Sequence, residues 1–355
     1  MKSELISKYL ERILLAVLFV SIFISMFSHY FAHQSVLSFV CSAMALIIIS
    51  KILGEATEQL TTYLGQGLAG LLNVTLSNLA ELIIIFAAVR EGLIELVQAG
   101  IVGSIVGNLL LVFGTSIYIG CRKHGTLHFN EDVGTLFINQ FLLVAAAIFM
   151  PTIFDRLHTG EAHQDYSNLL AIILVLVYLY FYRLELKDKR FEIIKEQATD
   201  IKQRWSKKKS MIILVTCALG AFVESEILVG EVENVAESLN ISQRFIGFIM
   251  LPLLGNIAEH FVAITAAYKK MTDLSLSIAV GSATQVGMVV APAAVLFGII
   301  TGHAVTLQFE AVPLSLLILS LVSAFVVLRD NKWNINEGVS LVVIYVLILI
   351  GFLFA

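Results

Sequence analysis

Two glutamates in matching sequence surroundings are the residues of this chain best suited to do chemistry. Glu81 lies in TLSNLAELIIIFAAVREG and Glu259 lies in LLGNIAEHFVAITAAYKK, and neither has a Lys or Arg within two helical turns. Because a charge at the centre of a membrane helix costs about 2.5–3.5 kcal/mol on insertion scales, each glutamate is expected to carry a proton or to hold a cation. Such a pair can exchange two protons for one divalent ion without burying net charge. The matched positions disfavour the alternative, two neutral glutamates with a purely structural role.

The two segments belong to a longer repeat that keeps its register without a gap. GSIVGN follows the first segment and GSATQV follows the second, and matched residues are 178 positions apart. The pairs are Asn78 and Asn256, Ala80 and Ala258, Glu81 and Glu259, Gly103 and Gly281, and Ser104 and Ser282. The second copy comes five predicted spans after the first, so the copies are expected to have opposite orientations in the membrane.

Inverted repeats of this kind bind ions near the midplane, often at helices interrupted by Gly, Asn or Pro. The candidate helix breakers here are Gly70, Asn73, Asn78, Pro252, Gly255 and Asn256. Broken turns at LSN and LGN are expected to free backbone carbonyls that can face a cavity.

The repeat also offers the oxygen ligands that a hard cation requires. Calcium takes about six to eight oxygens from carboxylates, amides and backbone carbonyls. Asn78 and Asn256 lie three residues before the glutamates, and the candidate outer ligands are Ser104, Asn108, Ser282 and Gln285. Small and polar residues are also common where membrane helices pack closely, so packing remains the alternative for these four. A soft metal is disfavoured because neither Cys nor paired His accompanies the carboxylates.

Several other polar residues allow two interpretations each. His260 directly follows Glu259, where the first copy has Leu82, and either modulates proton exchange or is a hydrogen-bonded packing residue. Further acids lie on the first predicted helix of each half, and they either line ion entry paths or mark wetted helix ends. These acids are Glu55 and Glu58 in the first half and Glu231 and Glu233 in the second.

The elements that must position these groups are predicted to be membrane helices. Hydrophobic residues make up 58% of the 355 and charged residues 14%, against roughly a quarter charged in soluble domains. Apolar stretches of about 20 residues, the length that crosses a hydrocarbon core, recur along the whole chain. They predict eleven spans, near 12–33, 36–62, 68–90, 94–120, 132–154, 167–187, 211–239, 243–268, 273–300, 304–328 and 337–355.

Charge and cysteine content exclude several classes of function. The net charge is −4, and the basic residues lie in short connections rather than in a patch, so no nucleic-acid partner is expected. The three cysteines have no spacing that indicates a disulfide framework or a metal site. The partners expected are the transported ions and the lipid bilayer.

The spans predict an all-α membrane protein with an internal division. Residues 1–35 form an extra N-terminal helix, 36–187 a first five-helix repeat, 188–210 a cytoplasmic linker rich in Lys and Arg, and 211–355 a second five-helix repeat. Lys and Arg concentrate on the cytoplasmic side of membranes. With a cytoplasmic N-terminus, only Arg90, Arg156 and Arg244 fall outside and Lys51 falls within a span, so this orientation is favoured.

These residues resemble the calcium/proton exchanger (CAX) family of the cation/calcium exchanger superfamily over most of the chain. SNLAEL with GSIVGN and GNIAEH with GSATQ are similar to its two signature segments. The resemblance implies a Ca²⁺/H⁺ antiporter that exports Ca²⁺ by alternating access, with Glu81 and Glu259 binding Ca²⁺ or protons in turn. It implies that helices near 36–62 and 211–239 slide to open one side at a time. Ser77 stands where the second copy has Gly255, which leaves the local backbone geometry open.

The same resemblance implies a compact, prokaryote-like protein of the cell membrane that needs no cofactor besides its transported ions. The sequence is compatible with a homo-oligomer and does not specify one.

Three other functions were weighed. A sodium/calcium exchanger of the same superfamily would share the fold and both glutamates, but those relatives usually carry a TS-type motif and more hydroxyl and acidic ligands. A membrane-embedded zinc hydrolase is disfavoured because no HExxH or equivalent spacing is present. Composition alone permits a passive channel, whereas a two-copy inverted acid site favours alternating access.

Overall fold

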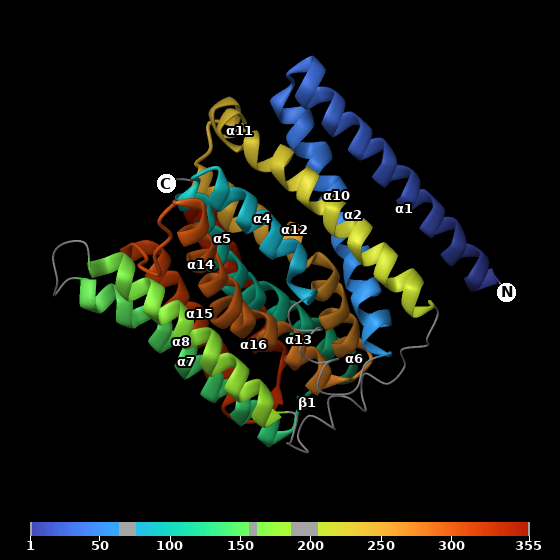
Figure 1. The fold of residues 1–355 in the computed structure, drawn as a ribbon. Coiled ribbons are helices and arrows are strands. Elements are labelled where there is room, and N and C mark those ends of the chain that lie inside the picture. Colours follow the sequence, from blue (N-terminus) through green and yellow to red (C-terminus); the bar gives the residue numbers. More distant parts are fainter. Residues whose placement is uncertain (1, 64–75, 156–161, 186–204, 354–355) are drawn as a thin grey trace.

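The protein is a bundle of long apolar helices in a computed structural model that describes residues 2–63, 76–155, 162–185 and 205–353 (Figure 1). Ten helices within these ranges are long and apolar enough to cross a membrane. The prediction of an all-α membrane protein is confirmed. The predicted span at 68–90 is described only from residue 76, and Gly70, Asn73 and most of the linker 188–210 lie outside the described residues.

The first half of the chain contains one extra helix and the first repeat. Its elements are α1 (Lys2–Phe27), η1 (Ser28–Ala32), α2 (Ser35–Thr61), α4 (Leu79–Arg90), α5 (Ile94–Val106), η2 (Gly107–Val112), α6 (Phe113–His124), β1 (Leu127–His128), α7 (Glu131–Asp155) and α8 (Ala162–Glu185).

The second half follows a similar order, but its strand lies between the last two long helices rather than before them. Its elements are α10 (Lys207–Gly230), α11 (Val232–Leu239), α12 (Gln243–Tyr268), α13 (Thr272–Gln285), η3 (Val286–Val290), α14 (Ala291–Thr301), α15 (Ala311–Leu328), β2 (Lys332–Trp333) and α16 (Ile335–Leu353). The two short strands pair antiparallel and join the halves, with Leu127 opposite Trp333.

The contacts between helices occur in matched pairs. Replacing each helix by its counterpart in the other half converts one contact of a pair into the other. Helix α2 packs on α12 while α10 packs on α4, and α6 packs on α16 while α14 packs on α8. The π-helices η2 and η3 interrupt the two halves at corresponding places, and they end at residues that match after the 178-residue shift. Each glutamate-bearing helix therefore packs against the first helix of the opposite repeat, as expected when two halves enclose a shared site.

Helix α12 is continuous, which differs from the expected break at LGN. It runs through Pro252, Gly255 and Asn256 without interruption, whereas α4 begins just after Asn78, as predicted. Pro252 lacks the N–H that would bond the Phe248 carbonyl. A Cβ on Gly103 would lie only 2.0 Å from that carbonyl oxygen, so the glycine lets α5 approach α12 at this point.

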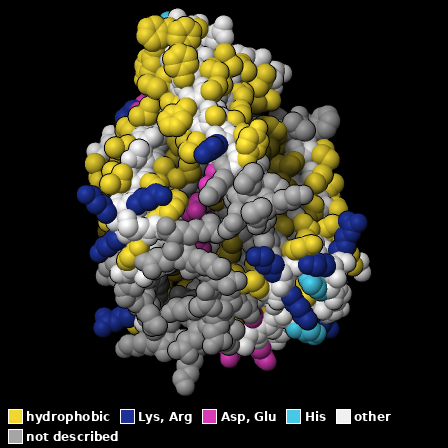
Figure 2. All heavy atoms as spheres, turned by 90° about the vertical axis from the view of Figure 1, so that its right-hand side faces the viewer, with side chains coloured by type: hydrophobic (Ala, Val, Ile, Leu, Met, Phe, Trp, Pro, Cys, Tyr) yellow, Lys and Arg dark blue, Asp and Glu magenta, His cyan; other side chains and the backbone are white. Residues whose placement is uncertain are grey.

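The outer surface has the distribution of side chains expected in lipid. Aromatic residues on α1 face outward, with Phe19 68% and Phe23 69% exposed. Figure 2 shows hydrophobic side chains over the upper part of one face and Lys and Arg gathered lower down. This separation of apolar and basic surface is typical of a helix bundle that ends at a membrane boundary.

Candidate functional site

Helices α4 and α12 bring the first glutamate and the second asparagine into direct contact. Asn256 Nδ2 donates a hydrogen bond to Glu81 Oε2 at 2.9 Å and another to Ser104 Oγ at 3.2 Å. Ser104, on α5, also hydrogen-bonds the Glu81 carboxyl. Glu81 and Asn256 are each 1% exposed and Ser104 is fully buried, so this cluster is sealed from solvent.

The second glutamate has a different set of partners. Ser282 on α13 and Ser77, just before α4, both hydrogen-bond the Glu259 carboxyl, which is half-buried. Asn78, the symmetry partner of Asn256, donates to Gln285 Oε1 at 2.6 Å. Both halves therefore contribute to the site, but it is not symmetric. The Glu81 carboxyl contacts an amide and a hydroxyl, whereas the Glu259 carboxyl contacts two hydroxyls.

The cluster leaves buried acceptor oxygens unused. Within the described part of the chain, Glu81 Oε1 and Asn256 Oδ1 accept no hydrogen bond. A buried oxygen without a donor is costly unless a proton or a cation satisfies it. Glu81 and Glu259 also lie close enough for their charges to interact, so two negative charges here would repel each other. Carboxylate and amide oxygens arranged in this way suit a hard cation such as Ca²⁺.

Gly255 sets the distance between the two helices at the site. A Cβ on Gly255 would lie 2.8 Å from Glu81 Cβ and 3.0 Å from Glu81 Cα. No side chain fits there without separating α4 from α12. In the first copy the matching residue is Ser77, whose hydroxyl hydrogen-bonds the Glu259 carboxyl. The difference between Ser77 and Gly255 thus has two physical reasons: Gly255 allows close packing against Glu81, and Ser77 hydrogen-bonds Glu259.

Asn108 follows Ser104 on the next helical turn, and His260 directly follows Glu259. Among the described contacts, neither side chain hydrogen-bonds a glutamate of the site. Asn108 is 1% exposed within η2, and its Nδ2 finds no acceptor among the described residues. His260 is half-buried on α12, and its Nε2 has no hydrogen-bond partner in the same part of the chain. Successive residues on a helix point about 100° apart, which turns His260 away from the direction of Glu259.

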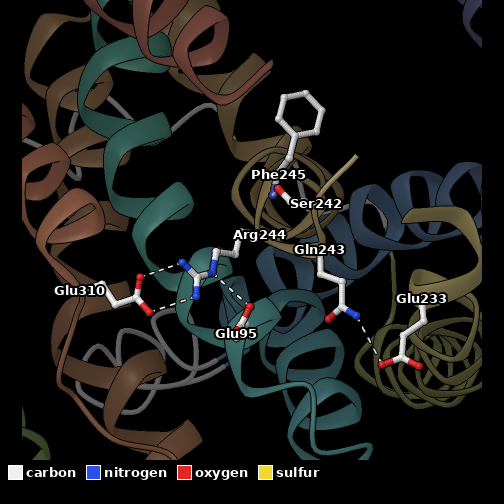
Figure 3. A network of polar contacts seen from close by, with 7 residues as sticks. All are labelled: Glu95, Glu233, Ser242, Gln243, Arg244, Phe245 and Glu310. Atoms are coloured by element: carbon white, nitrogen blue, oxygen red, sulfur yellow. Dashed lines mark hydrogen bonds and ion pairs between the residues drawn. The ribbon is translucent and has the colours of Figure 1, made fainter. Parts of the chain in front are cut away.

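The acids predicted as entry-path residues fall into different environments. Near the end of α2, Glu55 is half-buried and Glu58 is exposed. Glu233 is exposed on α11 and accepts a hydrogen bond from Gln243 Nε2 at 3.3 Å (Figure 3).

Glu231, by contrast, is 5% exposed and held by a set of donors. His29 Nδ1 lies 2.7 Å from Glu231 Oε1, and Asn234 Nδ2 donates to Oε2 at 3.0 Å. Burial opposes its ionisation, but the hydrogen bonds from Asn234, Ser35 and His29 together lower the pKa of Glu231 below its ordinary value. These contacts link η1 to the junction of α10 with α11.

A network that sequence reasoning did not predict surrounds the start of α12 (Figure 3). Ser242 caps the helix by accepting from Phe245 N at 3.1 Å, and Arg244 bonds Glu310 at 2.7 and 3.0 Å and Glu95 at 3.1 Å. These three ionic residues line an open pocket of about 40 Å³. The capping serine was visible in the sequence, but the ion partners are too far apart along the chain to be paired without the fold.

Comparison with known proteins places the chain in a family. Residues 34–186 and 209–354 match the model of the family described as sodium/calcium exchanger protein. The chain belongs to this family. The resemblance noted from the signature segments is confirmed at this level.

Similar members of the exchanger family cover most of the chain. It is 35% identical over 339 residues to a Ca²⁺/H⁺ antiporter of Aphanothece halophytica, covering 90% of this chain and 91% of that one. It is 30% identical over 327 residues to a vacuolar calcium ion transporter of Schizosaccharomyces pombe, covering 89% and 79%. The crystal structure of the Ca²⁺/H⁺ antiporter protein YfkE superimposes with a TM-score of 0.84 at 29% identity, covering 97% of this chain and all of that one.

Proposed function

We propose that the protein is a Ca²⁺/H⁺ antiporter in which Glu81 and Glu259 bind Ca²⁺ or protons in turn. The observation that carries this proposal is the pair of buried oxygens, Glu81 Oε1 and Asn256 Oδ1, that accept no hydrogen bond from the described residues where the two halves meet. A proton on the glutamate or a bound cation relieves that cost, and the two solutions exclude each other. Exchange of one for the other is the chemistry of an antiporter.

The coordinating set supports the proton-coupled function over the sodium-coupled alternative. Ser104 and Asn256 join Glu81, while Ser77 and Ser282 join Glu259, so each carboxyl has two neutral partners. Among the described residues no group of three His, Cys, Asp or Glu side chains gathers in one place. Fewer acids suit one divalent ion or two protons better than several sodium sites.

The orientation and membrane belong to the proposal as well. A cytoplasmic N-terminus follows from the basic residues at the ends of spans, and it puts the turn between η1 and α2 outside. Export of Ca²⁺ would then use an inward proton gradient across a prokaryotic cell membrane. Sliding of α2 and α10, which pack on each other and on the two glutamate-bearing helices, would expose the site to one side at a time.

The test is Ca²⁺ uptake by purified protein in proteoliposomes under an imposed pH gradient, with and without sodium. A pH gradient alone should drive uptake, and Glu81→Gln and Glu259→Gln should each abolish it. Glu237→Gln, which changes an exposed acid on α11, should transport normally. Uptake that requires sodium would leave the fold intact and establish the sodium/calcium exchanger instead.

Competition between Ca²⁺ and protons gives a second test. If both occupy one carboxyl pair, Ca²⁺ affinity must fall as pH drops, because the pair titrates as a coupled unit. Affinity that stays flat between roughly pH 6 and 8 would argue against shared occupancy.

A further inference from the structure

A buried acid outside the ion site lies where the extra helix meets the second repeat. Glu224 is on α10, seven residues before Glu231, and is 1% exposed. Both of its carboxyl oxygens contact one hydroxyl of α1: Ser25 Oγ lies 3.0 Å from Oε1 and 2.8 Å from Oε2. The ion site does not use this group, because the partners of Glu81 and Glu259 come from α4, α5, α12, α13 and Ser77.

A proton on Glu224 would add a second donor at this contact, where Ser25 supplies only one. Ser25 Oγ is also 2.9 Å from the Ile22 carbonyl on its own helix, so its single proton faces three acceptor oxygens. If that proton goes to Ile22, an ionised Glu224 would meet the lone pairs of Ser25. A protonated Glu224 can donate to Ser25 while Ser25 donates to Ile22, so both hydroxyl protons find an acceptor.

The charges around Glu224 do not compensate an ionised carboxylate. Among the described residues it forms no ion pair. From α2, the Cys41 thiol interacts with it electrostatically, and Ser42 is a neutral hydroxyl neighbour that carries no compensating charge. On α4, Arg90 pairs with Glu226 and Glu91, and on η1 His29 pairs with Glu231.

We propose that Glu224 is a proton-binding site separate from the ion site, and that its neutral carboxyl holds helix α1 against α10. An unpaired carboxylate in an apolar helix interface is costly. Loss of the proton therefore favours separation of α1 from α10, which would let water reach the charge. Helix α1 packs mainly on α2, and the proton on Glu224 secures its smaller contact with α10.

Infrared difference spectroscopy at neutral pH tests the protonation in a Glu81→Gln/Glu259→Gln background, so the result does not depend on the transport function. Adding Glu224→Gln should remove a carboxylic-acid C=O band. Adding Glu237→Gln instead should remove an ionised carboxylate band, because Glu237 is exposed. If Glu224→Gln also removes a carboxylate band, the proposal is wrong. Ser25→Ala gives a second reading, because loss of its hydroxyl should shift the acid C=O band to higher frequency; an unshifted band would contradict the contact.

Spin-label distances test the docking. Labels at Val20 on α1 and Leu219 on α10 both point to the lipid side, and Cys41, Cys121 and Cys217 are replaced by Ala beforehand. At the alkaline pH where the acid band disappears, the distance should lengthen or broaden with Glu224 present and stay unchanged with Glu224→Gln. An identical distribution in both proteins at that pH would overturn the docking role.

Discussion

Asn256 of α12 donates a 2.9 Å hydrogen bond to Glu81 of α4, so an amide of one repeat holds the carboxyl of the other. The matching amide, Asn78, lies against Gln285. The two carboxyl groups therefore have different hydrogen-bond partners, although the sequence around them is repeated.

Asn256→Ala should weaken Ca²⁺ binding by roughly tenfold or more. A hydrogen bond to a charged group contributes about 1.5–3 kcal/mol, and the substitution also removes an amide oxygen available to the ion. Calorimetric titration of the purified protein measures the change. Asn336→Ala, on the exposed start of α16, is the matched control and should bind normally. Equal affinity of the two variants would remove Asn256 from the ion site.

Gly255→Ala should impair Ca²⁺ binding while the protein still folds. The added Cβ would lie 2.8 Å from Glu81 Cβ and force α12 away from α4. Gly54→Ala on α2 is the control, because nothing lies within 4 Å of the Cβ it would add. Binding affinity and thermal stability in detergent should be measured together. The interpretation fails if both variants bind Ca²⁺ like the parent protein.

Glu231→Gln should destabilise the protein at neutral pH but not in strong acid. Although burial opposes ionisation, hydrogen bonds from Asn234, Ser35 and His29 lower the pKa of Glu231. A carboxyl with a lowered folded-state pKa stabilises above its ordinary pKa and loses that effect as pH falls through the lowered value. We expect a loss of about 1.5–3 kcal/mol at neutral pH.

Thermal unfolding of the Glu231 variant at several pH values checks this expectation. Glu233→Gln, two residues away and exposed, should change stability little at any pH. A stability difference for Glu231→Gln that persists unchanged into strong acid would mean that the ionised carboxyl is not its source.

Arg244→Gln should lower stability by less than about 1 kcal/mol despite its three close contacts. Arg244 is 40% exposed and its partners Glu95 and Glu310 are more exposed still, so water and salt screen the attraction. The effect should shrink further at high ionic strength. Unfolding at low and high salt is the measurement. Arg329→Gln, whose exposed side chain forms no ion pair with the described residues, should show no salt-dependent loss.

The sequence was informative where physical constraints repeat along the chain. Helical spans follow from hydropathy alone, and the 178-residue repeat identified Glu81, Glu259 and their asparagines as candidates without any tertiary information. The continuity of α12 through Pro252 could not be predicted, because it occurs where Gly103 of another helix packs against the Phe248 carbonyl, a contact that the local sequence does not reveal.

Contacts between the extra helix and the repeats were equally beyond the sequence. Ser25 and Glu224 are 199 residues apart, and His29 and Glu231 are 202 apart, so no local pattern relates them. Residue type and helix position suggest an entry-path acid or a wetted helix end at Glu231, and neither signal predicts the donors Asn234 and His29 that contact it.

The π-helices η2 and η3 allow one long helix to present different faces to two different surfaces. Each widens a helical turn by one residue, which rotates everything that follows by about 100° relative to an uninterrupted α-helix. Helix α5 can thus aim Ser104 at Glu81, while α6, continuing from it through η2, presents Phe113 to Trp333. This rotation, rather than a bend or a loop, divides each long helix into a part that faces the candidate site and a part that packs against the rest of the bundle.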